Sequence, residues 1–223
     1  MTHPEPPDPW PLRRLVLRTP RLELRPDDDD GLRELAEEAH RGVHPPEDMP
    51  FSVPWTDTDP AQLGRGVLQY HWGQRAQLAP EGWAIHFLVR HEGRVIGTQG
   101  LAGTDFRIVG EVETGSWIGL RHQGRGFGTE MRAAVLAFAF DHLGAVRARS
   151  AAFVDNARSS RVSGRLGYRP DGSAVVARRG EAAEQLRFVL AAADFVRPGW
   201  RLQVDGLEAG RPLLGLDPGA GPV

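Results

Sequence analysis

Cysteine and lysine are both absent from this 223-residue chain, and neither sign of charge prevails, since 27 basic side chains, all of them arginine, stand beside 29 acidic ones. Without cysteine the chain forms no disulfide and no Cys-ligated zinc site, and a cytoplasmic protein is the simplest expectation. A formal net charge of −2 provides no basic footprint for nucleic acid and no polybasic patch for a membrane surface. We therefore expect neither kind of partner.

Long hydrophobic runs are also missing. The longest stretch of uncharged apolar residues, 133–140, falls far short of the roughly 20 residues that span a bilayer. Residues 1–14 are rich in proline without an apolar centre, so we expect neither a signal peptide nor an anchor there. We expect this Pro-rich extension, one domain over 15–193 and a tail over 194–223, in which an Asp-Gly pair at 205–206 predicts a hairpin.

The most informative feature present is a glycine-rich stretch between a strand-like run (112–120) and a helix-like run (130–143): Gln123, Gly124, Arg125, Gly126, Phe127, Gly128 and Thr129. Glycines let the backbone approach a phosphate closely and adopt dihedral angles that side chains forbid. The free N–H groups and the dipole of a helix start favour an anion there. The stretch therefore predicts a pyrophosphate site.

Two common glycine-rich phosphate loops do not fit these residues. A P-loop needs a lysine after its last glycine, and the chain has none. A dinucleotide fingerprint needs a sixth-position glycine, but counting from Gly124 that position is Thr129, and no acidic-tipped second strand follows at the expected distance. A dinucleotide-dependent enzyme is thus disfavoured. What remains is Q-x-x-G-x-G, formed by Gln123, Gly126 and Gly128.

Hydrophobic periodicity predicts an α/β fold around this loop. We expect a first helix after residues 26–30, whose acidic side chains supply N-cap oxygens, with a stop at Gly42. Further helices are expected over 60–77, where Leu63, Val67 and Tyr70 face inward, and over 130–143 and 157–166. Strands are expected over 19–25, 83–90, 94–101, 111–120, 146–153, 174–178 and 186–190. This order predicts a central mixed sheet, mostly antiparallel, with a parallel strand pair on either side of the loop helix and flanking helices.

Three motifs resemble the GNAT superfamily of acyl-coenzyme A N-acyltransferases. The Q-x-x-G-x-G pattern resembles its motif A, residues 19–25 resemble the opening strand of the RimJ/RimL-like branch, and Val154-Asp155-Asn156 with Leu166-Gly167-Tyr168 resemble a later motif. These motifs cover roughly residues 19–192. Residues 49–55 and 115–136 are also similar to an actinobacterial family member described as using succinyl-coenzyme A. The resemblance implies the GNAT fold, in which the parallel pair splays apart and the cofactor enters the gap.

The resemblance implies transfer of an acetyl or succinyl group from acyl-CoA to a primary amine by direct attack. Such a reaction needs an uncharged amine, oxyanion stabilisation and a proton for the thiolate. Glu113 matches the general base proposed in RimJ/RimL-like enzymes, and Glu111 could equally serve. Ser159 matches a serine thought to protonate the thiolate, although serines at helix starts also act as N-caps.

The same resemblance implies the residues that bind acyl-CoA. Backbone groups of Ile118 and Leu120 would pair with the pantetheine amides as an added strand does, and Asn156 would bond the pantetheine arm or close a turn. The pyrophosphate would lie on residues 123–129, where Arg125 adds positive charge. Three further arginines either reach the adenosine 3'-phosphate or form a solvated face: Arg158, Arg161 and Arg165.

The chain departs from the family where many members carry a tyrosine one turn before the Gly-aromatic pair, because Ser163 stands there. Tyr168 replaces the common phenylalanine of that pair, and we expect it in the core. Since the usual acid is missing, a non-catalytic acyl-CoA-binding module is the alternative to an enzyme.

On the acceptor side, an apolar link between the first two helices carries Met49, Phe51 and Trp55, which we expect to bind substrate. If the donor is succinyl-CoA, we expect residues of the link over 45–55, with His44 nearby, to meet its distal carboxylate. The acceptor is a protein N-terminus, a lysine side chain or a small amine, and the apolar link and tail predict a homo-oligomer. His40 and His44 lie four residues apart without a third ligand, so no metal is expected.

Overall fold

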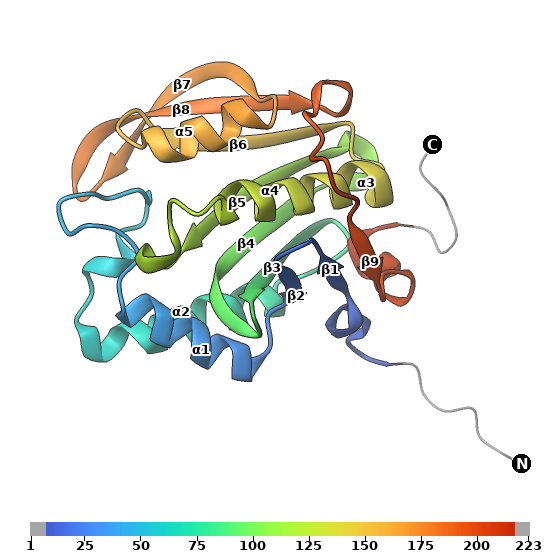
Figure 1. Ribbon diagram of the computed structural model, residues 1–223, viewed down its shortest axis with the longest axis horizontal. Helices are drawn as coiled ribbons and strands as arrows, with labels where there is room; N and C mark the ends of the chain where they lie inside the picture. The colour runs from blue at the N-terminus through green and yellow to red at the C-terminus, as the bar shows by residue number, and fades with distance from the viewer. Residues whose placement is uncertain (1–7, 217–223) are drawn as a thin grey trace, which may run out of the picture.

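The computed structural model describes residues 8–216, which form a nine-stranded sheet with helices on both faces (Figure 1). The strands follow the order β7-β8-β6-β5-β4-β3-β2-β1-β9. Neighbours are antiparallel except β5 and β6, which are parallel. The expected mixed sheet with a parallel pair around the loop helix is confirmed.

Most elements overlap the expected ranges, although β7 and β8 begin at residues 169 and 181 instead of the expected 174 and 186. The strands are β1 (Val16–Arg18), β2 (Glu23–Pro26), β3 (Gly82–His91), β4 (Arg94–Thr104), β5 (Glu111–Ile118), β6 (Arg147–Phe153), β7 (Arg169–Arg178), β8 (Glu181–Ala191) and β9 (Gln203–Asp205). The helices are α1 (Asp29–His40), α2 (Pro60–Ala76), α3 (Phe106–Val109), α4 (Phe127–Phe138) and α5 (Ala157–Arg165), with a π-helical extension of α4 over Ala139–Leu143. Short 3-10 turns occupy Pro11–Arg14, Trp55–Asp57, Leu120–His122, Ala192–Asp194 and Glu208–Leu214.

The two faces of the sheet have separate cores. Alternation along β3 sends Phe87 and Val89 to the core that contains α4, whereas Leu88 joins the core of α1 and α2 on the opposite face. On α2 the buried positions are Leu63, Val67 and His71. The sequence pattern placed Tyr70 on this inner face, and that assignment is wrong, because its side chain is 54% exposed.

The opening strand is interrupted. The sequence predicts one strand over 19–25, but β1 and β2 pair antiparallel and residues 19–22 turn between them. Thr19 and Arg21 leave the sheet because they bind Glu130 on α4: the Thr19 hydroxyl donates to its carboxylate at 2.6 Å and Arg21 Nε at 2.7 Å. The motif therefore anchors the helix that begins at the glycine loop.

The predicted C-terminal hairpin is wrong. β9 pairs antiparallel with β1 instead of a neighbouring segment, because β1 offers an unpaired backbone edge, and the chain then continues into the Glu208–Leu214 turn. Leu207 and Leu214 are buried in the α4-side core. The tail is thus part of the domain, and the sequence argument for an interface hairpin loses its basis. Residues 1–7 of the Pro-rich extension and 217–223 of the tail lie outside the described residues.

Within residues 8–216 no helix combines the length and apolar character needed to cross a membrane. The same residues contain no group of three or more His, Cys, Asp or Glu side chains placed to hold a metal ion. A hollow of about 400 Å³ lies beside the tail, lined by Arg14, His142, Val204, Gly206, Leu207, Glu208 and Ala209. It contains none of the expected site residues.

Candidate active site

The parallel strands β5 and β6 pair over only a few residues. Their register runs from Glu111 and Arg147 to Glu113 and Arg149, after which β5 continues to Ile118 without β6 beside it. At the point of divergence the Thr114 hydroxyl donates to the Arg149 carbonyl at 3.3 Å. The second half of β5 therefore faces a gap on its β6 side.

The glycine loop lies at the end of β5 and starts α4 without a side-chain cap. Gly124 and Gly126 adopt φ of 76° and 84°, values that favour glycine, and Gly126 caps the helix without a side-chain hydrogen bond. The Glu130 N–H is the first to bond back, to the Gly126 carbonyl at 3.1 Å. The N–H groups of Phe127, Gly128 and Thr129 have no partner within residues 8–216. These bare amides coincide with the residues at which the sequence predicts an anion site.

Positive side chains stand at this helix start. The Arg21 and Arg125 guanidinium carbons lie 4.7 and 5.0 Å from the centre of the Phe127 ring, which is buried. Arg21 is neutralised by Glu130, whereas Arg125 is exposed and has no acidic partner in the described part of the chain. Arg125 is therefore the loop cation available to a phosphate.

Gln123 shapes the loop with its side chain. Its Nε2 donates to the carbonyls of Val43 at 2.8 Å and Ile118 at 2.9 Å, and its Oε1 accepts from Arg158 at 2.7 Å. Leu120 is likewise engaged, because its N–H donates to the Gly42 carbonyl at 2.9 Å. These bonds tie the loop to the link that follows α1. Arg158 lies beside the loop, while Arg161 and Arg165 are exposed.

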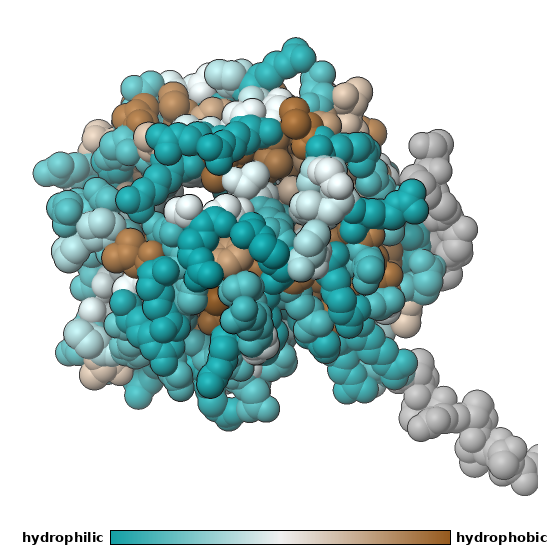
Figure 2. Space-filling view, in the orientation of Figure 1, coloured by the Kyte–Doolittle hydropathy of each residue, from teal (hydrophilic) through white to brown (hydrophobic). Residues whose placement is uncertain are grey.

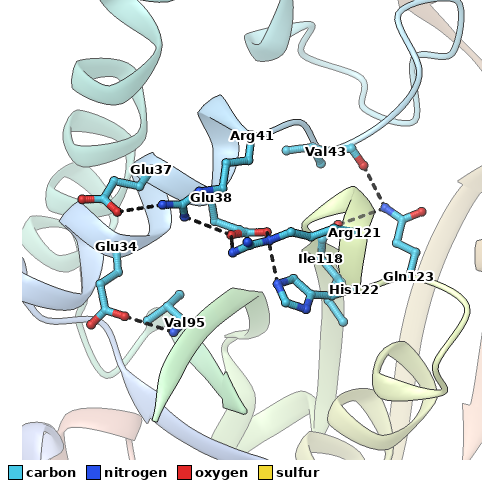
Figure 3. A network of polar contacts seen from close by, with 10 residues as sticks. All are labelled: Glu34, Glu37, Glu38, Arg41, Val43, Val95, Ile118, Arg121, His122 and Gln123. Atoms are coloured by element: carbon cyan, nitrogen blue, oxygen red, sulfur yellow. Dashed lines mark hydrogen bonds and ion pairs between the residues drawn. The ribbon is translucent and has the colours of Figure 1, made fainter. Parts of the chain in front are cut away.

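A buried carboxylate holds the turn that precedes the loop (Figure 3). Glu38 on α1 is fully buried and accepts from Arg121 Nε at 3.0 Å and Nη2 at 2.5 Å, with Arg41 at 3.3 Å. His122 Nε2 lies 3.4 Å away, and burial is the main cause that lowers the pKa of this imidazole. Gly119 is required here, since a Cβ would overlap the carboxylate. We call this the Glu38 cluster.

The α1/α2-facing side of β5 carries the candidate base. Glu113 is exposed and has no ion-pair partner among the described residues, whereas Glu111 accepts from Arg147 and Arg149 at 2.5 Å each. The hydrogen bonds from Arg149 and Arg147 lower the pKa of Glu111. On the same face a Cβ at Gly115 would meet nothing within 4 Å, so the strand leaves open space beside Glu113. Of the two carboxylates, Glu113 is free to accept a proton.

On the opposite side of the gap, Asn156 and Ser159 stand at the start of α5. Asn156 is the N-cap, and its side-chain oxygen accepts from the Ser159 N–H at 3.1 Å. The Ser159 hydroxyl is therefore not the cap, and it is partly exposed. Tyr168 is buried as expected, and its hydroxyl lies 3.2 Å from that of Thr114. Burial raises the pKa of Tyr168.

Sequence reasoning missed Arg132, which lies on α4 between the two arms of the gap. It is 5% exposed, and its Nη1 donates to the Ser163 hydroxyl at 3.0 Å and its Nη2 to the Ser116 hydroxyl at 3.4 Å. No carboxylate pairs with it in the described chain, and its Nε has no hydrogen-bond partner there. The available signal was a single arginine inside the apolar stripe from Met131 to Phe138.

The three residues expected to bind substrate form the interior of the link between α1 and α2. Met49 is buried, and the Phe51 ring lies 5.3 Å from that of Trp55, which in turn lies 5.5 Å from Trp117 on β5. Both ring nitrogens of His44 are bonded within the link, to the Pro45 carbonyl at 2.8 Å and the Thr56 hydroxyl at 2.7 Å. These groups therefore pack among themselves and, through Trp55, against Trp117, two residues along β5 from Gly115.

The link reaches the far arm of the sheet. Arg179, at the β7–β8 turn, binds both carboxylate oxygens of Asp57 at 2.7 Å and the Pro46 carbonyl at 3.1 Å. Arg178 donates to the Met49 carbonyl at 3.4 Å. The link and the hairpin thus meet beyond the gap, as the blue and orange ribbons show in Figure 1.

The surface over α4 and α5 is mainly hydrophilic, and hydrophobic groups show between these helices (Figure 2). Parted strands, a bare helix start and a flanking acid define the class of protein: residues 14–169 match the acetyltransferase (GNAT) domain. The chain belongs to the GNAT family and is an acyl-CoA-dependent N-acyltransferase.

Solved structures similar to this chain include RimJ from Mycobacterium smegmatis in complex with CoA-disulfide, at 19% identity and a TM-score of 0.65, covering 82% of this chain and 90% of that one. RimL, a ribosomal alpha-N-protein acetyltransferase in complex with coenzyme A, has 17% identity and a TM-score of 0.62, with 80% and 99% covered. A spermidine N-acetyltransferase chimera built from SpeG of Vibrio cholerae has 17% identity and a TM-score of 0.60, with 78% and 96% covered. These likenesses confirm the fold.

Proposed function

We propose that the protein moves an acetyl group from acetyl-CoA to the α-amino group of a polypeptide, by direct attack in the gap between β5 and β6. The observation that carries this proposal is the end of strand pairing at Glu113 and Arg149 beside the bare N-terminus of α4. The pyrophosphate binds the amides of residues 127–129 and Arg125. The pantetheine arm enters the gap along β5, past Ile118 and Asn156, and presents the thioester near Glu113.

Glu113 is the proposed general base, acting on the amine through water in the open space beside Gly115. An α-amino group has a reference pKa of about 7.7 to 8.0, against about 10.4 for lysine. An N-terminus is therefore deprotonated more easily near neutral pH, and it depends less on a general base than a lysine side chain does. Ser159 relays a proton from solvent to the leaving sulfur. RimL, whose name specifies an α-amino acceptor, supports this choice, and spermidine is the alternative that the SpeG chimera raises.

Acetyl is favoured over succinyl by the contacts around the acceptor side. A succinyl donor needs a cation for its distal carboxylate. His44 has both nitrogens bonded, Arg178 is paired with Asp155, and Arg179 is paired with Asp57. Turnover of acetyl-CoA and succinyl-CoA with one acceptor peptide compares the donors directly, and a higher kcat/KM for succinyl-CoA would overturn this choice.

The glycine loop provides the test of cosubstrate binding. Gly126 starts α4 with φ of 84°, and Gly144 ends its π-helical extension with φ of 80°. Alanine at either position costs about 1 to 2 kcal/mol of stability, because L side chains disfavour this region. Titration calorimetry should show that Gly126→Ala weakens coenzyme A binding at least about tenfold, while the matched Gly144→Ala leaves it unchanged. Equal binding by both variants would remove the proposed phosphate site.

The proposed base has its own matched control. Glu113→Gln should lower kcat by about 10²-fold near pH 7 and leave the affinity for acetyl-CoA unchanged. Glu111→Gln, which removes a carboxylate already bound by two arginines, should retain kcat within about twofold. Thiol release with an N-terminal peptide, an Nα-blocked lysine peptide and spermidine then identifies the acceptor. Tight coenzyme A binding without turnover of any amine would favour the binding-module alternative.

A further inference from the structure

Arg132 is a buried cation without a carboxylate partner among residues 8–216. Arg132 is 5% exposed, and in the described chain its guanidinium group donates hydrogen bonds only to the hydroxyls of Ser163 and Ser116. Burying a guanidinium without an anion is costly, and such groups are normally paired. A buried guanidinium whose partners are hydroxyl groups is suited to hold an anion.

The position of Arg132 indicates which anion. α4 lies over β5 and beneath α5 in Figure 1, and Arg132 spans from Ser116, on the unpaired half of β5, to Ser163 on α5. The hydroxyls of Thr114 and Tyr168 meet where the strands part, and Tyr168 lies close enough to Arg132 for the two side chains to interact electrostatically. The bare amides of residues 127–129 lie at the start of the same helix. A chain that runs from those amides along β5 brings its terminal atoms to Ser116.

We propose that Arg132 and Ser116 form the site for the coenzyme A thiolate that leaves when the acyl group is transferred. This inference rests on the proposed function. The Ser116 oxygen accepts from Arg132, so its own O–H is left to donate into the gap, and Ser116 is partly exposed there. The sulfur receives this hydrogen bond, backed by the guanidinium charge. Arg132 acts through Ser116 and is therefore a positioning residue, whose positive charge supports the hydrogen bond from Ser116 to the sulfur.

The step balances with groups already named. The amine nitrogen attacks the thioester carbonyl carbon, the C–N bond forms, and the C–S bond breaks with its electron pair moving to sulfur. The amine proton passes through water to Glu113. The thiolate is held at Ser116 and Arg132 until a proton from solvent, relayed by Ser159, neutralises it. Because the negative charge on sulfur develops only in the transition state, Arg132 should favour that state over the uncharged thioester.

The acidic groups on the surrounding elements do not neutralise the charge of Arg132. Glu111 is paired with Arg147 and Arg149, Glu113 lies on the opposite face of β5, and Glu130 is paired with Arg21. Tyr168 beside Arg132 stays neutral, because burial raises the pKa of its hydroxyl. The remaining charged groups of α5 are the exposed arginines Arg158, Arg161 and Arg165.

The test compares coenzyme A with S-ethyl-coenzyme A, whose sulfur does not ionise. A cysteine thiol has a reference pKa of about 8.5, and titration of coenzyme A without protein supplies the reference for its own thiol. In the wild-type protein, calorimetry between about pH 6 and pH 9 should show coenzyme A binding at least about tenfold more tightly as thiolate than as thiol, which lowers the pKa of the bound thiol by about one unit. The affinity for S-ethyl-coenzyme A should show no such dependence.

Arg132→Met should reduce this preference to about twofold or less while S-ethyl-coenzyme A still binds, and Arg132→Lys should restore part of it. With acetyl-CoA, Arg132→Met should lower kcat and leave KM unchanged. Tyr168→Phe, which removes the neighbouring hydroxyl but no charge, is the matched control and should keep the thiolate preference.

Each outcome separates the two proposals. If neither coenzyme A nor S-ethyl-coenzyme A binds the wild-type protein, the proposed function fails. If both bind equally at every pH, or if Arg132→Met keeps the lowered pKa of the bound thiol, the thiolate site is overturned while the proposed function stands. Far-ultraviolet circular dichroism of each variant confirms that the fold is retained.

Discussion

The Glu38 cluster and Arg132 are two buried charges with opposite surroundings. Glu38 is fully buried and meets Arg41, Arg121 and His122, so its charge is neutralised within the protein (Figure 3). Arg132 is equally enclosed but meets only hydroxyl groups. The difference teaches that a buried charge neutralised within the protein, such as Glu38, shapes the loop. A buried charge without a counter-charge, such as Arg132, indicates where we propose that a ligand binds.

The largest effect that tests this comparison is loss of the Glu38 charge. Glu38→Gln keeps the side-chain shape but removes charge-assisted hydrogen bonds to Arg41 and Arg121. We expect the free energy of unfolding to fall by about 3 to 5 kcal/mol in urea denaturation. Glu37→Gln, one residue away and exposed, is the control and should change it by less than about 0.5 kcal/mol. Equal losses in the two variants would contradict a structural role for the Glu38 cluster.

A smaller effect concerns buried titratable groups that are neither paired nor charged, because burial favours their neutral form. Burial lowers the pKa of His71 to about 3 and of His86 to about 4, and raises that of Asp27 to about 6. Unfolding lets the histidines take up protons below their reference pKa of about 6.5, so stability is lost as the pH falls from there toward 4. Asp27 opposes this trend between about pH 4 and 6, because the folded state keeps its proton.

Two histidines outweigh one aspartate, so the net free energy of unfolding should fall by about 3 kcal/mol between pH 7 and pH 4. Urea denaturation at several pH values measures this slope. His86→Leu removes one of the two histidines, so the contributions of His71 and Asp27 nearly cancel and the dependence should become almost flat. A wild-type stability that is constant over this range would show that these histidines are not buried in the neutral form.

The smallest effect has the opposite sign. Arg132→Met removes the unpaired cation and replaces it with an apolar side chain, so the protein without ligand should unfold at the same or slightly higher urea concentration, with a gain of about 1 kcal/mol. The same measurement as for Glu38→Gln checks it. A loss comparable to that of Glu38→Gln would show that Arg132 is structural, and the contrast between the two regions would disappear.

The sequence predicted the elements that depend on local pattern. The glycine loop, the parallel pair around α4 and the N-cap region before α1 follow from periodicity and turn chemistry, and Asp28 indeed accepts from the Gly31 N–H at 2.7 Å. The pairing of β9 with β1 was not predicted, because an Asp-Gly pair indicates a turn but not its partner strand. Long-range pairing depends on which edge is free in the folded sheet.

The site was predicted where motifs are contiguous and missed where burial decides. Glu38 and Arg132 are charged residues on helices, which a pattern assigns to solvent, and only the packing of α1 and α4 places them inside. Gln123 was expected at the phosphate, and its contacts with Val43, Ile118 and Arg158 show a supporting side chain that spacing alone does not reveal. The roles of Glu113 and Ser159 stay predictions.

The pairing of β9 with β1 also bears on solubility. By covering β1, the short tail strand leaves only the narrow edge of Gln203–Asp205 open to water, and Arg18 and Asp205 add an ion pair beside it. An uncovered strand edge is a template on which copies of a protein aggregate. A chain shortened ahead of residue 203 would uncover both the edge of β1 and the core surface that Leu207 and Leu214 bury, and its first symptom should be precipitation during expression, before any loss of catalysis is measured.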